Sequence, residues 1–153
     1  MTIKVRKAKV DDIDQIHNLL LLYSATGELL PRSRQEIRNN FDVFFISEEN
    51  NTVAGCASLE IFTTDLAEVR SLAVDPNFTK SGHGRLLVKK IEEEANSRGL
   101  TRLFALTYVP HFFQKLGFKI TSMENLPEKV FGVCISCPNF NNCDEIAMIK
   151  DIV

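Results

Sequence analysis

The chain begins with a strand pattern that is followed by a helix pattern. Residues 3–8 alternate apolar with basic side chains, and this period of two predicts a half-buried strand. Asp11 or Asp12 then offers a helix cap. Four apolar residues after the cap share one helical face: Ile13, Ile16, Leu20 and Tyr23. We therefore expect an amphipathic helix directly after the first strand.

A second, shorter helix is predicted after an interruption. A glycine and a proline break the helical pattern within residues 26–32, which are expected to form an exposed link. Ser33 and Glu36 have the spacing of a capping box, which opens a helix at this point. The buried face of this helix is predicted to hold two residues: Ile37 and Phe41.

Strand patterns dominate the middle of the chain. Residues 43–46 form a buried apolar run, and a turn at residues 49–51 separates it from a second run at 53–62. The two runs are expected to pair as a hairpin. Another turn, at residues 63–65, leads into a strand over 66–74, which Asp75 and Pro76 end.

Helices and strands alternate in the remainder of the chain. A glycine-bearing loop at residues 79–85 precedes a helix whose apolar residues are spaced by four: Leu87, Ile91 and Ala95. Strands at 102–108, 118–122 and 144–151 and a short helix at 110–116 follow, with a long irregular stretch at 125–143. Such long loops usually carry function or are disordered.

This order of elements predicts the fold class. Antiparallel hairpins come first, and a strand, loop, helix and strand then form a crossover. We expect an α+β fold of three layers, with one mixed, mostly antiparallel sheet and helices on both faces. A length of 153 residues fits a single domain over residues 1–153.

Composition narrows the classes of function. With 18 basic and 20 acidic side chains the net charge is -2, so no basic surface for nucleic acid is expected. The longest aliphatic run, residues 19–22, is too short to cross a membrane. Because the N-terminus also lacks an export signal, a cytoplasmic location is expected.

The loop at residues 79–85 is the first candidate for chemistry. Gly82 and Gly84 lie between a strand and a helix, where free backbone N–H groups at the positive end of the helix dipole suit a pyrophosphate. Glycine matters because a side chain would hold the ligand away. By itself, the same pattern fits a tight turn with a glycine cap equally well.

The context of the loop resembles a known family. The strand at 68–76, the loop, the amphipathic helix and the motif at 112–118 together resemble the GCN5-related N-acetyltransferase (GNAT) superfamily over nearly the whole chain. The resemblance implies that acetyl-CoA is the co-substrate. It also implies a set of coenzyme-binding residues: Leu72, Ala73, Val74, Thr79, Lys80, Ser81, Gly82, His83, Gly84, Arg85, Phe112 and Phe113.

Two positions depart from the pattern of that family. Thr79 stands where the family usually has Arg or Gln, although Lys80 beside it can supply a positive charge. Phe113 stands where the family commonly places a tyrosine as general acid, and a phenyl ring has no proton to donate. Another acid is therefore needed, and a noncatalytic acetyl-CoA sensor stays an alternative.

A narrower resemblance concerns the substrate. The segments at 27–33, 67–74 and 126–148 resemble the short, single-domain amino-acid N-acetyltransferases of the N-acetylglutamate synthase group, which begins arginine biosynthesis. This implies acetylation of the α-amine of glutamate or glutamine. A protein N-terminus or an antibiotic as the acceptor amine remains an alternative.

Several residues are candidates for roles at this site. Glu68 resembles the glutamate of the synthase group near the substrate amine and is the expected base. Its alternatives are an exposed strand carboxylate or a carboxylate that simply pairs with Arg70 on the same face. Tyr108 is the expected acid, and His111 is an alternative. His83 is a weaker candidate, because in the loop it is expected to face phosphate. The residues expected to bind the substrate carboxylates are Arg32, Ser33, Arg70 and Lys129.

The cysteines near the C-terminus are expected to stay reduced. Cys134, Cys137 and Cys143 lack an obvious fourth ligand for zinc, so no metal is predicted, although an occasional disulfide stays open. Homodimer formation through a sheet edge is a further open alternative.

Overall fold

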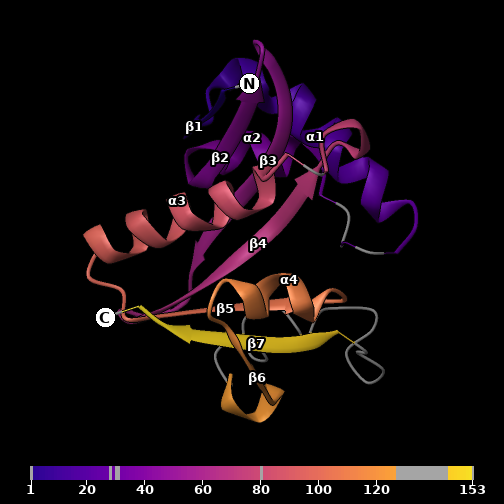
Figure 1. The fold of residues 1–153 in the computed structure, drawn as a ribbon. Helices are drawn as coiled ribbons and strands as arrows, with labels where there is room; N and C mark the ends of the chain where they lie inside the picture. The colour runs from indigo at the N-terminus through magenta and orange to yellow at the C-terminus, as the bar shows by residue number, and fades with distance from the viewer. Residues whose placement is uncertain (1, 28, 30–31, 80, 127–144, 153) are drawn as a thin grey trace. The chain divides into compact units, whose positions relative to one another are not determined.

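The computed structural model describes residues 2–27, 29, 32–79, 81–126 and 145–152. Within these residues, hydrogen bonds order seven strands as β1-β2-β3-β4-β5-β7-β6. The strands are β1 (Ile3–Lys7), β2 (Phe44–Glu49), β3 (Thr52–Ile61), β4 (Leu66–Val74), β5 (Arg102–Thr107), β6 (Lys119–Thr121) and β7 (Ile146–Asp151) (Figure 1). The α-helices are α1 (Ile13–Ser24), α2 (Arg34–Asn39), α3 (His83–Ser97) and α4 (Pro110–Lys115).

The chain divides into two compact units, each with its own packing. The first unit consists of Met1–Leu59 with Val69–Glu94, and the second of Glu60–Glu68 with Ala95–Val153. Strand β4 passes through both, since its first three residues belong to the second unit and the rest to the first.

The first unit is built on antiparallel pairing. β1 pairs with β2, and β2 pairs with β3 in the predicted hairpin. Asn50 and Asn51 connect β2 to β3 with φ angles of 54° and 63°, the left-handed values that a two-residue type I′ turn requires. The register shifts between Ser47 and Glu48, which pair with Gly55 and Val53; the extra residue, Ala54, marks a bulge in β3.

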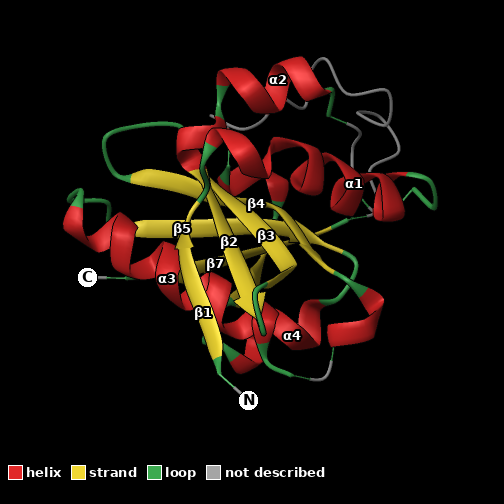
Figure 2. Cartoon of the chain, turned by 90° about the horizontal axis from the view of Figure 1, so that it is seen from above, coloured by secondary structure: helices red, strands yellow, loops and turns green. Residues whose placement is uncertain are grey.

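Helices cover both faces of β2 in this unit (Figure 2). The buried faces of α1 and α2 pack against alternate residues of the strand, Phe44 and Ile46. Ser47 belongs to the opposite face and contacts His83, the first residue of α3. The prediction of helices on both faces is therefore confirmed for this unit.

The second unit pairs β4 with β5 in parallel, and it pairs β7 antiparallel to both β5 and β6. The parallel pair is the product of the predicted crossover through α3. A cluster of buried apolar residues forms the core of this unit: Leu66, Phe104, Leu126 and Ala147. In the part of the chain that the structure describes, no helix is both long and apolar enough to cross a membrane.

Some local predictions need correction. Asp12 does precede α1, but its carboxylate makes no cap hydrogen bond to that helix and instead binds Arg6 and the backbone N–H of Lys9. Phe41 lies in a separate 3₁₀ turn, since α2 ends at Asn39. Ser33 caps α2 as predicted, and its Oγ accepts a hydrogen bond from the N–H of Glu36 at 3.1 Å. Most of the irregular stretch at 125–143 lies outside the described residues.

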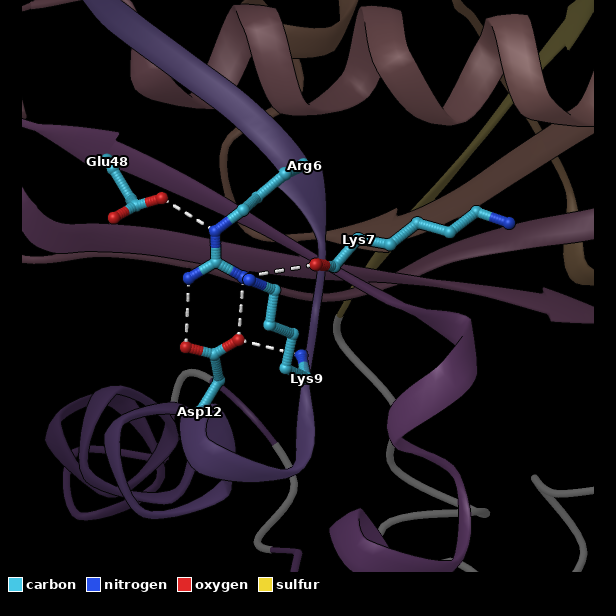
Figure 3. Close-up of polar contacts among 5 residues, drawn as sticks. All are labelled: Arg6, Lys7, Lys9, Asp12 and Glu48. Carbon is cyan, nitrogen blue, oxygen red and sulfur yellow. Dashed lines mark hydrogen bonds and ion pairs between the residues drawn. The ribbon is translucent and has the colours of Figure 1, made fainter.

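A cluster of charges fixes β1 to the start of α1 and to β2 (Figure 3). The Arg6 guanidinium donates two hydrogen bonds to the Asp12 carboxylate, at 2.7 Å and 3.0 Å. Its Nε donates a third to Glu48 at 2.6 Å. Asp12 also accepts a hydrogen bond from the backbone N–H of Lys9 at 2.7 Å. The Arg6 guanidinium and these bonds hold the pKa of Asp12 below its ordinary value.

We predict that Asp12→Asn lowers the free energy of unfolding by about 2 kcal/mol at neutral pH, because it removes a charge-assisted, bidentate pair. The unfolded chain takes up a proton at Asp12 first as the pH falls. The stabilisation that the Arg6–Asp12 pair contributes to folding is therefore complete above about pH 5 and is lost progressively below about pH 4. Urea unfolding of both proteins from pH 3 to pH 7 measures the difference.

Asp14→Asn is the matched control, because Asp14 pairs with Arg34 in solvent and its side chain is 76% exposed. Its effect should stay below about 0.5 kcal/mol. An Asp12→Asn deficit that is equal at pH 3 and pH 7 would contradict the assignment.

Candidate functional site

Strand β4 is bent at Ser71. This residue has a φ of 55°, a left-handed conformation that is costly for a residue other than glycine. Three side chains hold the bend. Ser58 Oγ donates to the carbonyl of Arg70 at 3.0 Å, the Cys56 thiol lies 3.6 Å from the carbonyl of Ser71, and Arg32 Nη1 donates to Ser71 Oγ at 3.0 Å. Backbone strain of this kind, supported by its surroundings, is typical of functional sites.

Arg32 is buried, which corrects the prediction of an exposed link at this residue, whereas Thr26 and Gly27 are exposed as predicted. The residue is only 5% exposed. Its Nε donates to the Glu36 carboxylate at 3.0 Å, and its guanidinium carbon lies 5.2 Å from the centre of the Phe44 ring. The sequence reading failed because it treated the whole link as polar surface. The guanidinium is instead oriented by three neighbours beside the bend of β4.

The end of β4 carries three of the predicted coenzyme-binding residues. Ala73 belongs to the core that packs under α1, whereas Leu72 and Val74 are partly exposed. The hydroxyl of Tyr23 donates to the carbonyl of Val74. Sequence reasoning placed Tyr23 on the apolar face of α1 and missed this contact, for which the only signal was a hydroxyl at the end of that face.

The glycine-bearing loop ends earlier than predicted, because α3 begins at His83. Gly82 has a φ of 93°, which favours glycine, and its carbonyl accepts the helical hydrogen bond from the N–H of Leu86 at 3.1 Å. Helix geometry then leaves the N–H groups of residues 82–85 without partners inside the helix. These groups, at the positive end of a helix of 15 residues, are suited to bind an anion.

Polar contacts shape the turn before that helix. The Asp75 carboxylate accepts a hydrogen bond from the N–H of Asn77 at 2.9 Å and opens a 3₁₀ turn, Pro76–Phe78. Thr79 is exposed, and its hydroxyl donates to the carbonyl of Pro76 at 3.3 Å. Ser81, Gly82 and Gly84 are partly exposed and Arg85 is exposed, so the turn is open to solvent.

His83 does not face solvent, and the prediction that it faces a phosphate is wrong. The residue is 1% exposed. Its Nδ1 lies 2.9 Å from Ser47 Oγ, and its Nε2 lies 2.9 Å from Glu49 Oε1. Sequence reasoning missed both partners. The available signal was the change within one strand from apolar residues, ending at Ile46, to the polar residues that begin at Ser47.

In the second unit, Glu68 is a buried side chain of β4. It is 3% exposed and lies opposite Phe104 in the pairing with β5. The alternative of a solvent-exposed strand carboxylate is therefore wrong. Burial of a carboxylate is costly, and carboxylates are rarely buried without a reason.

The other candidates of the second unit differ in exposure. Tyr108 follows β5 directly and is 42% exposed. Phe113 packs in the core, with its ring centre 5.0 Å from that of Phe112 and 5.2 Å from that of Phe118. Phe112 is partly exposed and His111 is exposed, so both are more accessible than Phe113.

Some predicted residues lie outside the described part of the chain: Lys80, Lys129, Cys134, Cys137 and Cys143. Among the described residues, no group of three or more His, Cys, Asp or Glu side chains is arranged to hold a metal ion.

Comparison with known proteins identifies the class. Residues 10–118 match the acetyltransferase (GNAT) family. The chain therefore belongs to this family, which confirms the predicted fold and the predicted enzyme class of N-acetyltransferase.

Three proteins that are similar to this chain indicate the kind of acetyltransferase it resembles. An uncharacterised N-acetyltransferase of Chlorobaculum tepidum is 37% identical over 97% of this chain and 96% of its own length. An amino-acid acetyltransferase of Shewanella oneidensis is 38% identical over 82% of this chain, but the match spans only 29% of that enzyme. N-acetylglutamate synthase from Neisseria gonorrhoeae, solved with coenzyme A and N-acetyl-glutamate, is 30% identical with a TM-score of 0.90 over 100% of this chain and 36% of the synthase chain.

We predict that Cys56 in the folded protein does not react with iodoacetamide at pH 8. Burial raises the pKa of its thiol to about 12, so almost no thiolate is present to react. Mass spectrometry of the peptide that contains Cys56 measures the labelled fraction. The same peptide from urea-unfolded protein, which should be fully labelled, is the control. Labelling at equal rates in both samples would contradict the buried environment.

Proposed function

We propose that this protein transfers the acetyl group of acetyl-CoA to the α-amine of an amino acid, L-glutamate or L-glutamine. The observation that carries the proposal is the likeness, over the whole chain, to a synthase solved with coenzyme A and N-acetyl-glutamate. The relatives named amino-acid acetyltransferase support the same class of substrate.

The coenzyme is proposed to bind at the end of β4 and the start of α3. The backbone N–H groups of residues 82–85 would hold its pyrophosphate, with Thr79, Lys80 and Ser81 beside them. The backbone from Leu72 to Val74 would contact the pantetheine arm. On α4, Phe112 would pack beside the coenzyme, since its partly exposed ring is more accessible than the buried ring of Phe113.

The chemistry requires a base and an acid. The ammonium of the amino acid must lose a proton before its nitrogen can attack the thioester carbonyl, and Glu68 is the proposed base, acting through water. The nitrogen forms a bond to the carbonyl carbon, and the tetrahedral intermediate then collapses with cleavage of the carbon–sulfur bond. Tyr108 is the proposed donor of a proton to the departing thiolate of coenzyme A.

The carboxylates of the substrate need fixed cations. Arg32, Arg70 and Lys129 are proposed for this role, with Ser33 as a neighbouring hydrogen-bond donor. Arg32 is supported best, because its guanidinium is held by Ser71 and Glu36 and would lose little conformational entropy on binding.

The biological setting is a further part of the proposal. The reaction would be the first step of arginine biosynthesis, carried out in the cytoplasm by one N-acetyltransferase domain over residues 1–153.

The function is tested by release of coenzyme A thiol from acetyl-CoA in the presence of single amino acids. We expect turnover with glutamate or glutamine and little with other amino acids, peptides or aminoglycosides. Coenzyme A binding by calorimetry without turnover for any amine would instead identify a noncatalytic sensor. Turnover with a peptide or an aminoglycoside alone would assign a different acceptor.

A second prediction concerns Glu68. Glu68→Gln should lower kcat by about 10²-fold to 10⁴-fold and leave the affinity for coenzyme A unchanged, because the amide cannot accept the proton of the amine. Steady-state kinetics and calorimetry measure the two quantities. Glu60→Gln on β3 is the matched control and should behave as the unaltered protein. Unchanged kcat in Glu68→Gln would remove Glu68 from the reaction.

A further inference from the structure

A buried polar group lies directly beneath the start of α3. It consists of His83 with Ser47 and Glu49, whose side chains lie 2.9 Å from the two ring nitrogens. The exposed fraction of the His83 side chain is 0% and that of the Glu49 side chain is 5%. Both ring nitrogens of His83 are engaged by Ser47 and Glu49, so no direct part in the acetyl transfer is assigned to this group.

Both ring nitrogens are satisfied in either protonation state. In the neutral ring, Nε2–H donates to the Glu49 carboxylate and the Ser47 hydroxyl donates to Nδ1. In the imidazolium, both nitrogens donate. The Phe78 ring completes the enclosure, edge-on to the imidazole at 5.6 Å between ring centres. The orientation of the imidazole is therefore determined on three sides.

The partners of His83 are themselves firmly held. Ser47 and Glu49 occupy alternate positions of β2, which pairs with β1 on one side and β3 on the other. Gly55 on β3 leaves the room that Ser47 requires, since a Cβ at that position would lie 2.8 Å from Ser47 Oγ. Through His83, its first residue, α3 is thus connected to β2.

The contacts of His83 with Ser47 and Glu49 matter because of the position of His83 in the chain. His83 immediately follows Gly82 and precedes Gly84, two residues that do little to restrict the backbone on their own. The N–H groups of residues 82–85 are the groups that helix geometry leaves free to bind an anion. A fixed side chain between two glycines supplies the rigidity that the glycines lack.

We propose, on the basis of the function proposed above, that His83 is a positioning residue for the pyrophosphate of the coenzyme. Through its bonds to Ser47 and Glu49 it holds the N–H groups of residues 82–85 in the orientation that binds the diphosphate. Preorganised donors bind an anion more tightly than donors that must first be ordered. Loss of the bonds should therefore weaken binding of any ligand that carries the diphosphate, and of no other ligand.

Two acetyl donors separate positioning from a general structural role. Acetyl-CoA carries the diphosphate, whereas S-acetylpantetheine lacks it. For Ser47→Ala and His83→Leu we expect the KM for acetyl-CoA and the Kd for coenzyme A to rise about tenfold to a hundredfold. kcat with acetyl-CoA, and kcat/KM with S-acetylpantetheine, should stay within about twofold of the unaltered protein. A twofold change corresponds to only about 0.4 kcal/mol.

Two control variants test whether the loss of affinity comes from the hydrogen bonds of His83. Glu49→Gln retains an acceptor for Nε2–H and should preserve most of the affinity, while Ser24→Ala on α1 should change nothing. If His83→Leu fails to fold, Ser47→Ala decides, because it removes one hydrogen bond without leaving a buried charge unpaired. Circular dichroism verifies folding in each variant.

Two results would overturn the inference. One is unchanged affinity for coenzyme A in folded Ser47→Ala and His83→Leu. The other is an equal loss of kcat/KM with both acetyl donors, which indicates a general structural role. Failure of the unaltered protein to bind coenzyme A would instead refute the proposed function.

Discussion

The left-handed backbone at Ser71 is the constraint on which much of the first unit depends. A strand residue in this conformation persists only when its neighbours hold it, and here Ser58, Cys56 and Arg32 do so from three directions. The buried position of Arg32 fits this requirement, because Ser71, to which its guanidinium donates, is itself only 8% exposed. The bend and the arginine that faces it form one structural unit.

Strand β2 extends this organisation to the other face of the sheet. Ile46 contributes to the core under α1 and α2, whereas Ser47 and Glu49 bind the first residue of α3. An apolar core and a polar anchor therefore use adjacent residues of the same strand. Arg6 adds a further connection through Glu48, on the face opposite to Ser47. The start of α3 is consequently supported by the best-packed part of the first unit.

Periodicity and turn residues were enough to predict the order of elements and the location of the glycine-bearing loop before α3. These features are local, so a single sequence contains them. The buried polar contacts could not be found in this way, because Ser47 and His83 are 36 residues apart and meet only through the pairing of strands. Arg32 was misplaced for the same reason. Residues around Gly27 and Pro31 look like surface in the sequence, and only the distant Ser71 explains why the guanidinium is buried.

The hairpin turn at Asn50 and Asn51 has a consequence far from its own position. Its two left-handed residues set the register of β2 against β3, and a shift of one residue in a strand exchanges its two faces. After such a shift, Ser47 and Glu49 would point into the apolar core and Ile46 would meet His83. The number of residues in a surface turn therefore determines whether α3 has an anchor, so insertions and deletions at this turn should be tolerated far less than substitutions by glycine.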